Sequence, residues 1–245
     1  MEEATIIPLL VVFAIIVIAI AITKLRQANR SESEEELRTF NNPAEETVVP
    51  SAREPAKLSD LLPPQFVVLD LETTGLNPAT DEIIEIGAIR VTLDAKNQLA
   101  FQTFVRPTRK VPRKITNITG ITQEMVDSDG IPLEEALCQF KEFIGDLPLV
   151  TFNAEFDMGF LHNAAKRHGA AIPNPYTCAL KRARRAWPEL PSYRLVDLAK
   201  WGNLSDVSTH RALGDCERAL IVFTSATSTL GQKVRWTKPT ATSSV

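Results

Sequence analysis

Two carboxylates stand two positions apart at the end of an apolar run. Asp70 and Glu72 follow Phe66-Val67-Val68-Leu69, with Leu71 between them. Side chains at i and i+2 point to the same face of a β-strand, so the two carboxylates are expected side by side. Neighbouring ionised carboxylates in a partly buried site repel each other unless a cation joins them. The pair therefore indicates either a site for a hard divalent ion or two acids at a solvated strand end.

A short polar turn follows this pair. Thr73 and Thr74 precede Gly75, a residue that permits a tight backbone turn. Two hydroxyls and exposed amides beside two carboxylates are suited to hold a ligand hydroxyl or a phosphate. The turn therefore favours the interpretation of a ligand site.

Three motifs, in order along the chain, carry a resemblance to a known family. They are Asp70-Leu71-Glu72-Thr73-Thr74-Gly75-Leu76, Asn153-Ala154-Glu155-Phe156-Asp157 and His210-Arg211-Ala212-Leu213-Gly214-Asp215. Together they resemble the DEDDh 3′–5′ exonucleases, a group that includes the proofreading subunit of bacterial DNA polymerase III, the RNase T type and oligoribonuclease. The resemblance extends from about Pro64 to Ser228. A lone Asp-x-Glu is weak support, whereas three ordered motifs form a specific signal.

The resemblance implies a site with two ions, Mg²⁺ or Mn²⁺. Asp70, Glu72 and Asp215 would bind the catalytic metal, and Asp70 would also contact the second ion. Asp157 would support the second ion through water, and His210 would act as general base on the attacking water. These roles agree with two-metal hydrolysis, in which one ion activates the nucleophile and the other stabilises the leaving oxygen. An imidazole near its usual pKa suits proton removal at neutral pH.

The resemblance also implies contacts to the terminal nucleotide. The backbone at Thr73 and Thr74 would meet it, and Leu76 would lie against its base unless it is a core leucine. Phe156 either stacks on a base or packs in the core. Thr119 stands where the family often has a histidine, which removes any implied nucleotide contact there and leaves catalysis unaffected.

Helical geometry restricts the placement of the general base. Five residues along an ideal helix place His210 and Asp215 about 140° apart. Both cannot easily point into one site from a regular helix, so His210 is expected on a loop or first turn before the helix that carries Asp215. Ser208 or Thr209 is the expected N-cap of that helix.

The elements around these motifs alternate in type. Strands are expected at residues 66–71, 83–91, 101–105 and 148–152, and helices at 133–144, 155–168, 193–201 and 210–228. The first three strands suggest an antiparallel meander. The order predicts an α/β domain, and the resemblance implies an RNase H-like mixed β-sheet flanked by helices.

The N-terminal region differs in composition from this domain. Residues 6–23 are almost continuously apolar and long enough to span a bilayer. Basic residues follow the run and acidic ones precede it, which favours an uncleaved single-pass anchor with the catalytic domain on the cytoplasmic side over a cleaved signal peptide. We therefore expect a transmembrane anchor with a basic flank at 1–30, an acidic flexible linker at 31–60, an exonuclease domain at 61–230 and a flexible tail at 231–245.

Overall composition does not indicate a protein that wraps nucleic acid. The 245 residues carry a net charge of -3, so a polyanion would have to be held locally and through metal ions. The cluster Lys181, Arg182, Arg184 and Arg185 is either a solvated helix face or a guide for the phosphate backbone. His162 and His168 are alternative bases by residue type and more typical of ordinary surface or core positions. The three scattered cysteines suggest reduced thiols.

The sequence thus predicts a membrane-tethered 3′–5′ exonuclease that releases nucleoside 5′-monophosphates from 3′ ends, with single-stranded DNA as the expected substrate. The enzyme alternative is an exoribonuclease, because discrimination against DNA depends on contacts to the 2′-hydroxyl that a sequence does not reveal. The alternative from another class is a catalytically silent membrane-anchored module that binds nucleic acid. The presence of all five motif residues weighs against the silent module. The sequence does not identify a protein partner.

Overall fold

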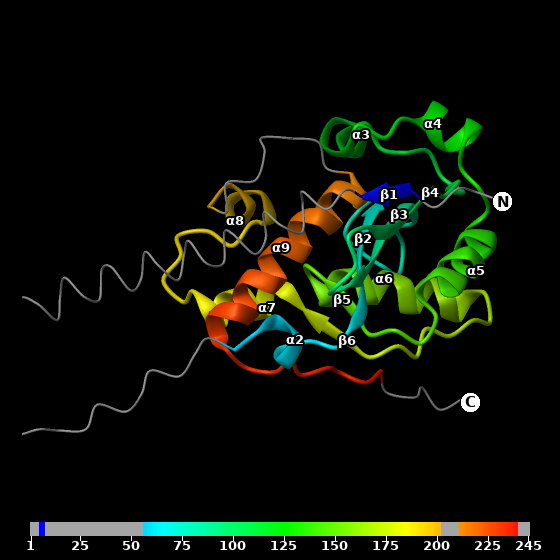
Figure 1. Cartoon of the computed structure of the whole chain (residues 1–245). Coiled ribbons are helices and arrows are strands. Elements are labelled where there is room, and N and C mark those ends of the chain that lie inside the picture. The colour runs from blue at the N-terminus through cyan, green and yellow to red at the C-terminus, as the bar shows by residue number, and fades with distance from the viewer. Residues whose placement is uncertain (1–4, 8–55, 202–210, 240–245) are drawn as a thin grey trace, which may run out of the picture.

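A mixed six-stranded sheet forms the centre of the molecule (Figure 1). The computed structural model describes residues 5–7, 56–201 and 211–239. The strands are β1 (Thr5–Ile7), β2 (Gln65–Thr73), β3 (Ile83–Thr92), β4 (Gln98–Phe104), β5 (Leu149–Thr151) and β6 (Tyr176–Cys178). Their order is β1-β4-β3-β2-β5-β6. The first four are joined by antiparallel pairs, and β5 and β6 continue parallel to β2.

Strand β2 is apolar on both faces because helices cover both. Val67 and Leu69 contact a core formed with α5 (Leu133–Ile144) and α6 (Ala154–Arg167). Phe66 and Val68, which point the other way, contact the long helix α9 (Ala212–Leu230). A strand covered on both faces reads as a continuous apolar run rather than an alternating one. By the same alternation, Asp70 and Glu72 belong to the α9 face.

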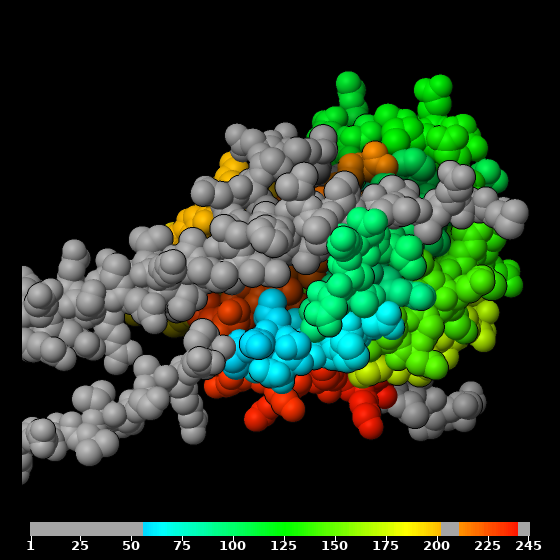
Figure 2. Space-filling view, viewed as in Figure 1, coloured from blue at the N-terminus to red at the C-terminus, as the bar shows by residue number. Residues whose placement is uncertain are grey.

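Five shorter helices complete the described part of the chain. They are α2 (Leu58–Leu61), α3 (Arg113–Thr119), α4 (Gln123–Ser128), α7 (Ala179–Ala186) and α8 (Leu195–Trp201). Helices α3 and α4 lie beyond the end of β4, where Ile84, Val111 and Ile121 form a small separate core. Figure 2 shows the green residues of this region along the upper edge of the visible face.

The expected α/β fold is confirmed, including the antiparallel meander of β2, β3 and β4. The four expected helices correspond to α5, α6, α8 and α9. Strand β6 and helices α2, α3 and α4 were not anticipated, and α7 was anticipated only as the helix face considered for its basic cluster. These elements are short, so their hydrophobic periodicity covers too few residues to be recognised.

The two ends of the domain differ from expectation. Helix α2 falls inside the segment predicted as linker, where Leu58 packs against the α9 core. Part of the expected flexible tail is also packed: Val234 is buried, and Thr237 forms an antiparallel bridge with Tyr176. These contacts arise because single apolar side chains outside the periodic elements still fill the core edge.

The predicted membrane anchor falls almost entirely outside the described residues. Ile6 and Ile7 are the exceptions, and they lie in strand β1 rather than in a helix. Within the ranges 5–7, 56–201 and 211–239, no helix has the length and apolarity to cross a membrane.

Candidate active site

Three carboxylates converge at the end of β2. Asp70, Glu72 and Asp215 each offer an oxygen atom, and these three atoms all lie within 4.8 Å of one another. Two come from β2 and the third from the first turn of α9. Oxygen donors at this separation match the ligands that Mg²⁺ and Mn²⁺ prefer, so the residues fit the expected metal. The structure thus brings together the three acids that the sequence analysis assigned to one metal ion.

A glycine brings α9 close enough to complete this group. Gly87 on β3 is the cross-strand partner of Asp70. A Cβ added at Gly87 would lie 2.6 Å from the carbonyl carbon of Ala212 and 2.7 Å from the nitrogen of Leu213. Only the absence of that side chain lets the start of α9 lie against the sheet, with Asp215 above Asp70.

Asp157 lies beside the three carboxylates without joining their group. It is 3% exposed on the first turn of α6, and the Thr151 hydroxyl donates a hydrogen bond to its carboxylate. Burial raises the pKa of Asp157 to about 7, against the lowering effect of the Thr151 bond. Its negative charge in turn helps to raise the pKa of Asp70. This placement fits the expected role of Asp157 as a more indirect metal ligand.

Three of these acids, Asp70, Glu72 and Asp157, have raised pKa values because they are buried, and other carboxylates crowd Asp70 and Glu72 as well. Burial raises the pKa of Asp70 well above its usual range, and the charges of Asp157 and Asp215 add to the effect. Burial also raises the pKa of Glu72 to about 8, followed by repulsion from Asp215 and Glu85. A divalent cation removes both causes by supplying positive charge at the oxygens. The electrostatics therefore favour a bound cation.

Arg218 supports Asp215 from the same helix. Its guanidinium forms an ion pair with the Asp215 carboxylate three residues earlier, and both side chains are largely buried. The pair holds one of the three converging carboxylates in a fixed orientation. The sequence reading missed this residue, although the i, i+3 spacing after a motif acid could have indicated it.

Glu85 was also missed, and it anchors the start of α9. This fully buried carboxylate pairs with the Arg211 guanidinium at 2.7 Å and accepts a hydrogen bond from the Ala212 amide at 3.0 Å. Gln102 donates a further hydrogen bond to it at 2.7 Å, and the Arg211 guanidinium lies over the Phe104 ring at 5.0 Å. A charged residue between Ile84 and Ile86 in a buried strand was the available signal.

His210 lies outside the described residues, so its position stays a prediction. The helix that carries Asp215 begins at Ala212, and its N-cap is Arg211. The expected N-cap at Ser208 or Thr209 is therefore wrong. The Arg211 side chain does not cap the helix. The carboxylate of Glu85, which is distant in sequence, accepts the hydrogen bond of the Ala212 amide instead.

The predicted substrate residues divide into two groups. Thr73 donates a hydrogen bond to the Gly75 carbonyl at 2.6 Å, and Thr74 accepts one from the Glu82 amide at 2.9 Å. Both hydroxyls thus shape the turn. Leu76 is 83% exposed, which rules out the alternative of a core leucine. Phe156 is half-buried with its ring 4.9 Å from that of Phe160, which favours packing over base stacking.

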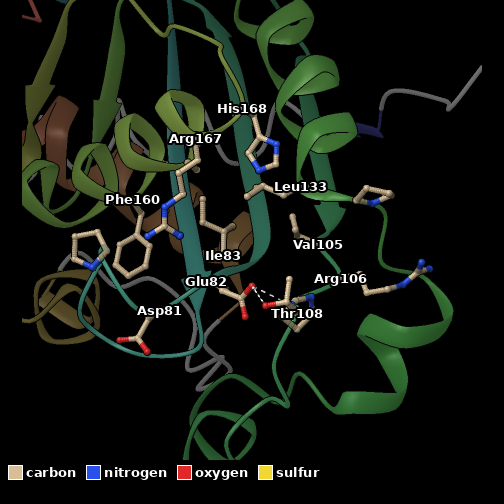
Figure 3. A pocket seen from close by; sticks show the side chains of 14 residues that line it. Asp81, Glu82, Ile83, Val105, Arg106, Thr108, Leu133, Phe160, Arg167 and His168 are labelled. Atoms are coloured by element: carbon tan, nitrogen blue, oxygen red, sulfur yellow. Dashed lines mark hydrogen bonds between the residues drawn. The ribbon is translucent and has the colours of Figure 1, made fainter. Parts of the chain in front are cut away.

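The other polar residues considered for the site lie outside the group of carboxylates and mostly contact their neighbours in the fold. His162 is half-buried with its ring edge toward Tyr176, and burial lowers its pKa. His168 follows α6 and lines a pocket of about 480 Å³ with Asp81 and Arg167 (Figure 3). Thr119 is buried and donates its hydroxyl to the Ile115 carbonyl at 3.1 Å. None of these residues belongs to the carboxylate group.

The fold and the site together define a class: an α/β domain with clustered carboxylates suited to divalent metal ions. The family model described as Exonuclease, of the RNase T type, matches residues 67–223. The chain therefore belongs to this exonuclease family.

Similar proteins include a DNA polymerase III and a subunit of a DNA polymerase III. The chain is 38% identical over 159 residues to a PolC-type DNA polymerase III of Caldanaerobacter subterraneus subsp. tengcongensis, covering 65% of this chain and 11% of the polymerase. It is 35% identical over 165 residues to the DNA polymerase III subunit epsilon of Aquifex aeolicus, covering 67% of this chain and 81% of that subunit. The chain thus spans about a tenth of the polymerase and most of the subunit.

Two solved structures share the fold. Exonuclease I of E. coli in complex with single-stranded DNA matches with a TM-score of 0.57 at 23% identity, over 65% of this chain and 40% of that one. Exonuclease X in complex with 5′-overhanging duplex DNA matches with a TM-score of 0.51 at 28% identity, over 66% and 90%.

Proposed function

We propose that this domain is a DEDDh 3′–5′ exonuclease that hydrolyses the last phosphodiester bond of single-stranded nucleic acid, with DNA as the expected substrate. The observation that carries the proposal is the convergence of Asp70, Glu72 and Asp215 within 4.8 Å, with Asp157 buried beside them. These acids fall in the motifs that the resemblance identified, inside the region matched by the family model.

In the proposed mechanism two divalent ions, Mg²⁺ or Mn²⁺, would supply activation of water and stabilisation of the leaving 3′ oxygen when bound. Asp70, Glu72 and Asp215 would hold the first ion, and Asp70 with Asp157 the second. Arg218 fixes Asp215, and Thr151 fixes Asp157. The exposed Leu76 would lie against the terminal base, while the backbone of the Thr73-Thr74 turn meets the terminal nucleotide.

His210 would take the proton of the attacking water. Replacing it by Ala would lower kcat by about two to four orders of magnitude, as expected for loss of a general base. His168→Ala, which removes a histidine from the far end of α6, is the matched control and is expected to leave kcat unchanged. Equal activity of wild type and the His210 variant would remove this residue from the mechanism.

The decisive assay follows single-stranded DNA and RNA oligonucleotides labelled at either end, with Mg²⁺ or Mn²⁺ and after chelation. A 3′–5′ exonuclease releases a 3′-terminal label first, as a monophosphate, and shortens the 5′-labelled strand stepwise. Asp70→Ala is expected to abolish release, while Asp60→Ala removes an exposed acid on α2 as the control. Activity that survives in Asp70→Ala would refute the proposal. Cleavage of RNA alone would select the exoribonuclease alternative, and inactivity on both would favour a silent binding module.

Membrane attachment is a separate proposal from the sequence. Residues 1–30 would hold the catalytic domain on the cytoplasmic side of a membrane. The full chain is expected in the membrane fraction after an alkaline carbonate wash, and a chain without residues 1–30 in the soluble fraction. Identical fractionation of the two would refute the anchor.

A further inference from the structure

We propose that residues 106–114 form the surface along which the nucleic-acid strand runs upstream of the terminal nucleotide. This basic segment carries Arg106, Arg109, Lys110, Arg113 and Lys114, and it contains no acidic residue. All five side chains are exposed. The proposal rests on the proposed function, because it concerns the strand whose 3′ end enters the carboxylate site.

Hydrogen bonds connect the basic segment to the active-site turn through one residue. The Glu82 carboxylate accepts bonds from the Thr108 amide at 2.9 Å, the Thr108 hydroxyl at 2.8 Å and the Arg109 amide at 3.1 Å (Figure 3). The backbone of Glu82 is in turn paired with Thr74, whose amide donates to the Glu82 carbonyl at 2.8 Å. Thr74 lies two positions after the metal ligand Glu72. The segment is therefore linked through Glu82 to the turn that follows the carboxylate site.

The segment is also held in shape before any ligand binds. Val111 and Ile115 pack into the small core with Ile84, next to the β3 residue Glu85. Pro107 and Pro112 restrict the backbone on either side of Val111. A charged surface ordered in advance loses less conformational entropy on binding than a flexible one.

The charges of the basic segment are available to a ligand. Arg109 donates to the Thr80 carbonyl at 3.2 Å and Arg106 to the Asp127 carbonyl at 3.4 Å, both neutral partners. Among the described residues, no carboxylate forms an ion pair with any of the five cations. Unpaired, exposed cations in a row are suited to phosphodiester groups.

The basic cluster on α7 was the candidate that the sequence offered for this role. Its charged side chains make more contacts with other protein groups than those of the basic segment do. Lys181 pairs with Glu155 at 2.7 Å. Arg182 is buried and donates to Thr227 at 2.7 Å. Arg184 lies over the Tyr193 ring at 5.6 Å, and Arg185 donates to the Gln232 side chain at 3.1 Å. The structure therefore favours the basic segment at residues 106–114, which extends into the first turn of α3, over α7 as the strand-binding surface.

The test compares two triple variants with the same loss of charge. Lys110→Gln, Arg113→Gln and Lys114→Gln neutralise the basic segment at residues whose side chains make no intramolecular hydrogen bond or ion pair in the described structure. Lys181→Gln, Arg184→Gln and Arg185→Gln neutralise α7. Binding of a labelled single-stranded DNA of about 15 nucleotides is measured in the Asp70→Ala background, which prevents digestion. Turnover is measured with Asp70 intact.

Neutralising the basic segment is expected to weaken binding of the long oligonucleotide about tenfold at low salt. Each lost phosphate contact lowers the slope of log K against log salt by about 0.7 for single strands, so the slope falls by up to about 2. A dinucleotide does not reach the segment, so its turnover is expected to be unchanged. The α7 variant is expected to behave like the parent on both substrates.

These outcomes separate the two proposals. Unchanged affinity and salt slope in the basic-segment variant would overturn the strand-binding surface, even with normal exonuclease activity. A loss confined to the α7 variant would move the surface to α7. Tight binding of an acidic peptide, without any for the oligonucleotide, would assign the segment to a protein partner. Failure of all chains to degrade any nucleic acid would instead refute the proposed function.

Discussion

The crowded carboxylates make the stability of the metal-free domain fall as pH rises. The pKa of Glu72 increases on folding from 4.5 to about 8, and that of Asp157 from 3.8 to about 7. A folded state with a raised pKa binds more protons than the unfolded chain. Its stabilisation is therefore complete below the unfolded pKa and is lost as pH rises through the folded pKa. The affected window extends from about pH 4 to about pH 8.

The magnitude follows from the pKa of Glu72. Between pH 6 and pH 8, linkage for this group alone lowers the free energy of unfolding by about 2 kcal/mol. Structural relaxation around the partly exposed Glu72 carboxylate makes this change in the free energy of unfolding smaller, and the titration of Asp157 makes it larger. For a domain of this size, about 1 kcal/mol corresponds to roughly 2–4 °C in Tm. We therefore expect the Tm after chelation to fall by about 4–8 °C between pH 6 and pH 8.

The assay is thermal unfolding by circular dichroism, with EDTA and with Mn²⁺, at several pH values. Mn²⁺ is expected to raise Tm more at pH 8 than at pH 6, because protons compete with the metal for the same oxygens. Glu72→Gln removes one titrating group and is expected to flatten the decline; the exposed Glu134→Gln on α5 serves as the control. A decline as steep in Glu72→Gln as in wild type would refute the reasoning.

Three further predictions concern side chains around the site. Gly87→Ala forces α9 away from Asp70. It is expected to lower kcat at least tenfold in a turnover assay and the free energy of unfolding in urea by about 1–3 kcal/mol. Full activity of this variant would contradict the close approach of α9 to the sheet. Glu85→Gln weakens the pair with Arg211 and is expected to lower the free energy of unfolding by about 2 kcal/mol in urea, which is less than the roughly 3–5 kcal/mol of a fully buried broken pair because Arg211 is partly exposed. Leu76→Ala is expected to change stability by less than about 0.5 kcal/mol while raising KM for oligonucleotides; an unchanged KM would remove Leu76 from the terminal-base contact.

The sequence predicted the central features because they depend on local patterns. The apolar run that ends in Asp70 and Glu72 defined β2, and period-2 alternation put both acids on one face. The spacing of Leu133 to Ile144 defined α5. The motifs identified the acid group, whose members come from elements far apart in the chain, and only the family resemblance could bring Asp215 to β2.

Other features required the folded structure because they depend on contacts between distant segments. Glu85 caps α9 across 127 positions of sequence, which no local pattern indicates. Arg182 is chemically a surface residue, yet it is buried with Thr227 and under the segment that follows α9. Val234 looked like part of a loose tail because a single apolar residue has no periodicity.

The same arrangement explains how a chain of net charge -3 would act on a polyanion. The clustered carboxylates cannot attract phosphate by themselves, and without metal Asp70 and Glu72 destabilise the fold as they ionise. Rigid neighbours hold them together against this repulsion: Gly87 admits α9, Arg218 fixes Asp215, and Thr151 fixes Asp157. Bound cations would convert the repulsive group into an attractive one, and the basic segment would supply positive charge to the strand outside it. Charge is thus organised locally, so the net charge of the chain carries no information about the sign of its ligand.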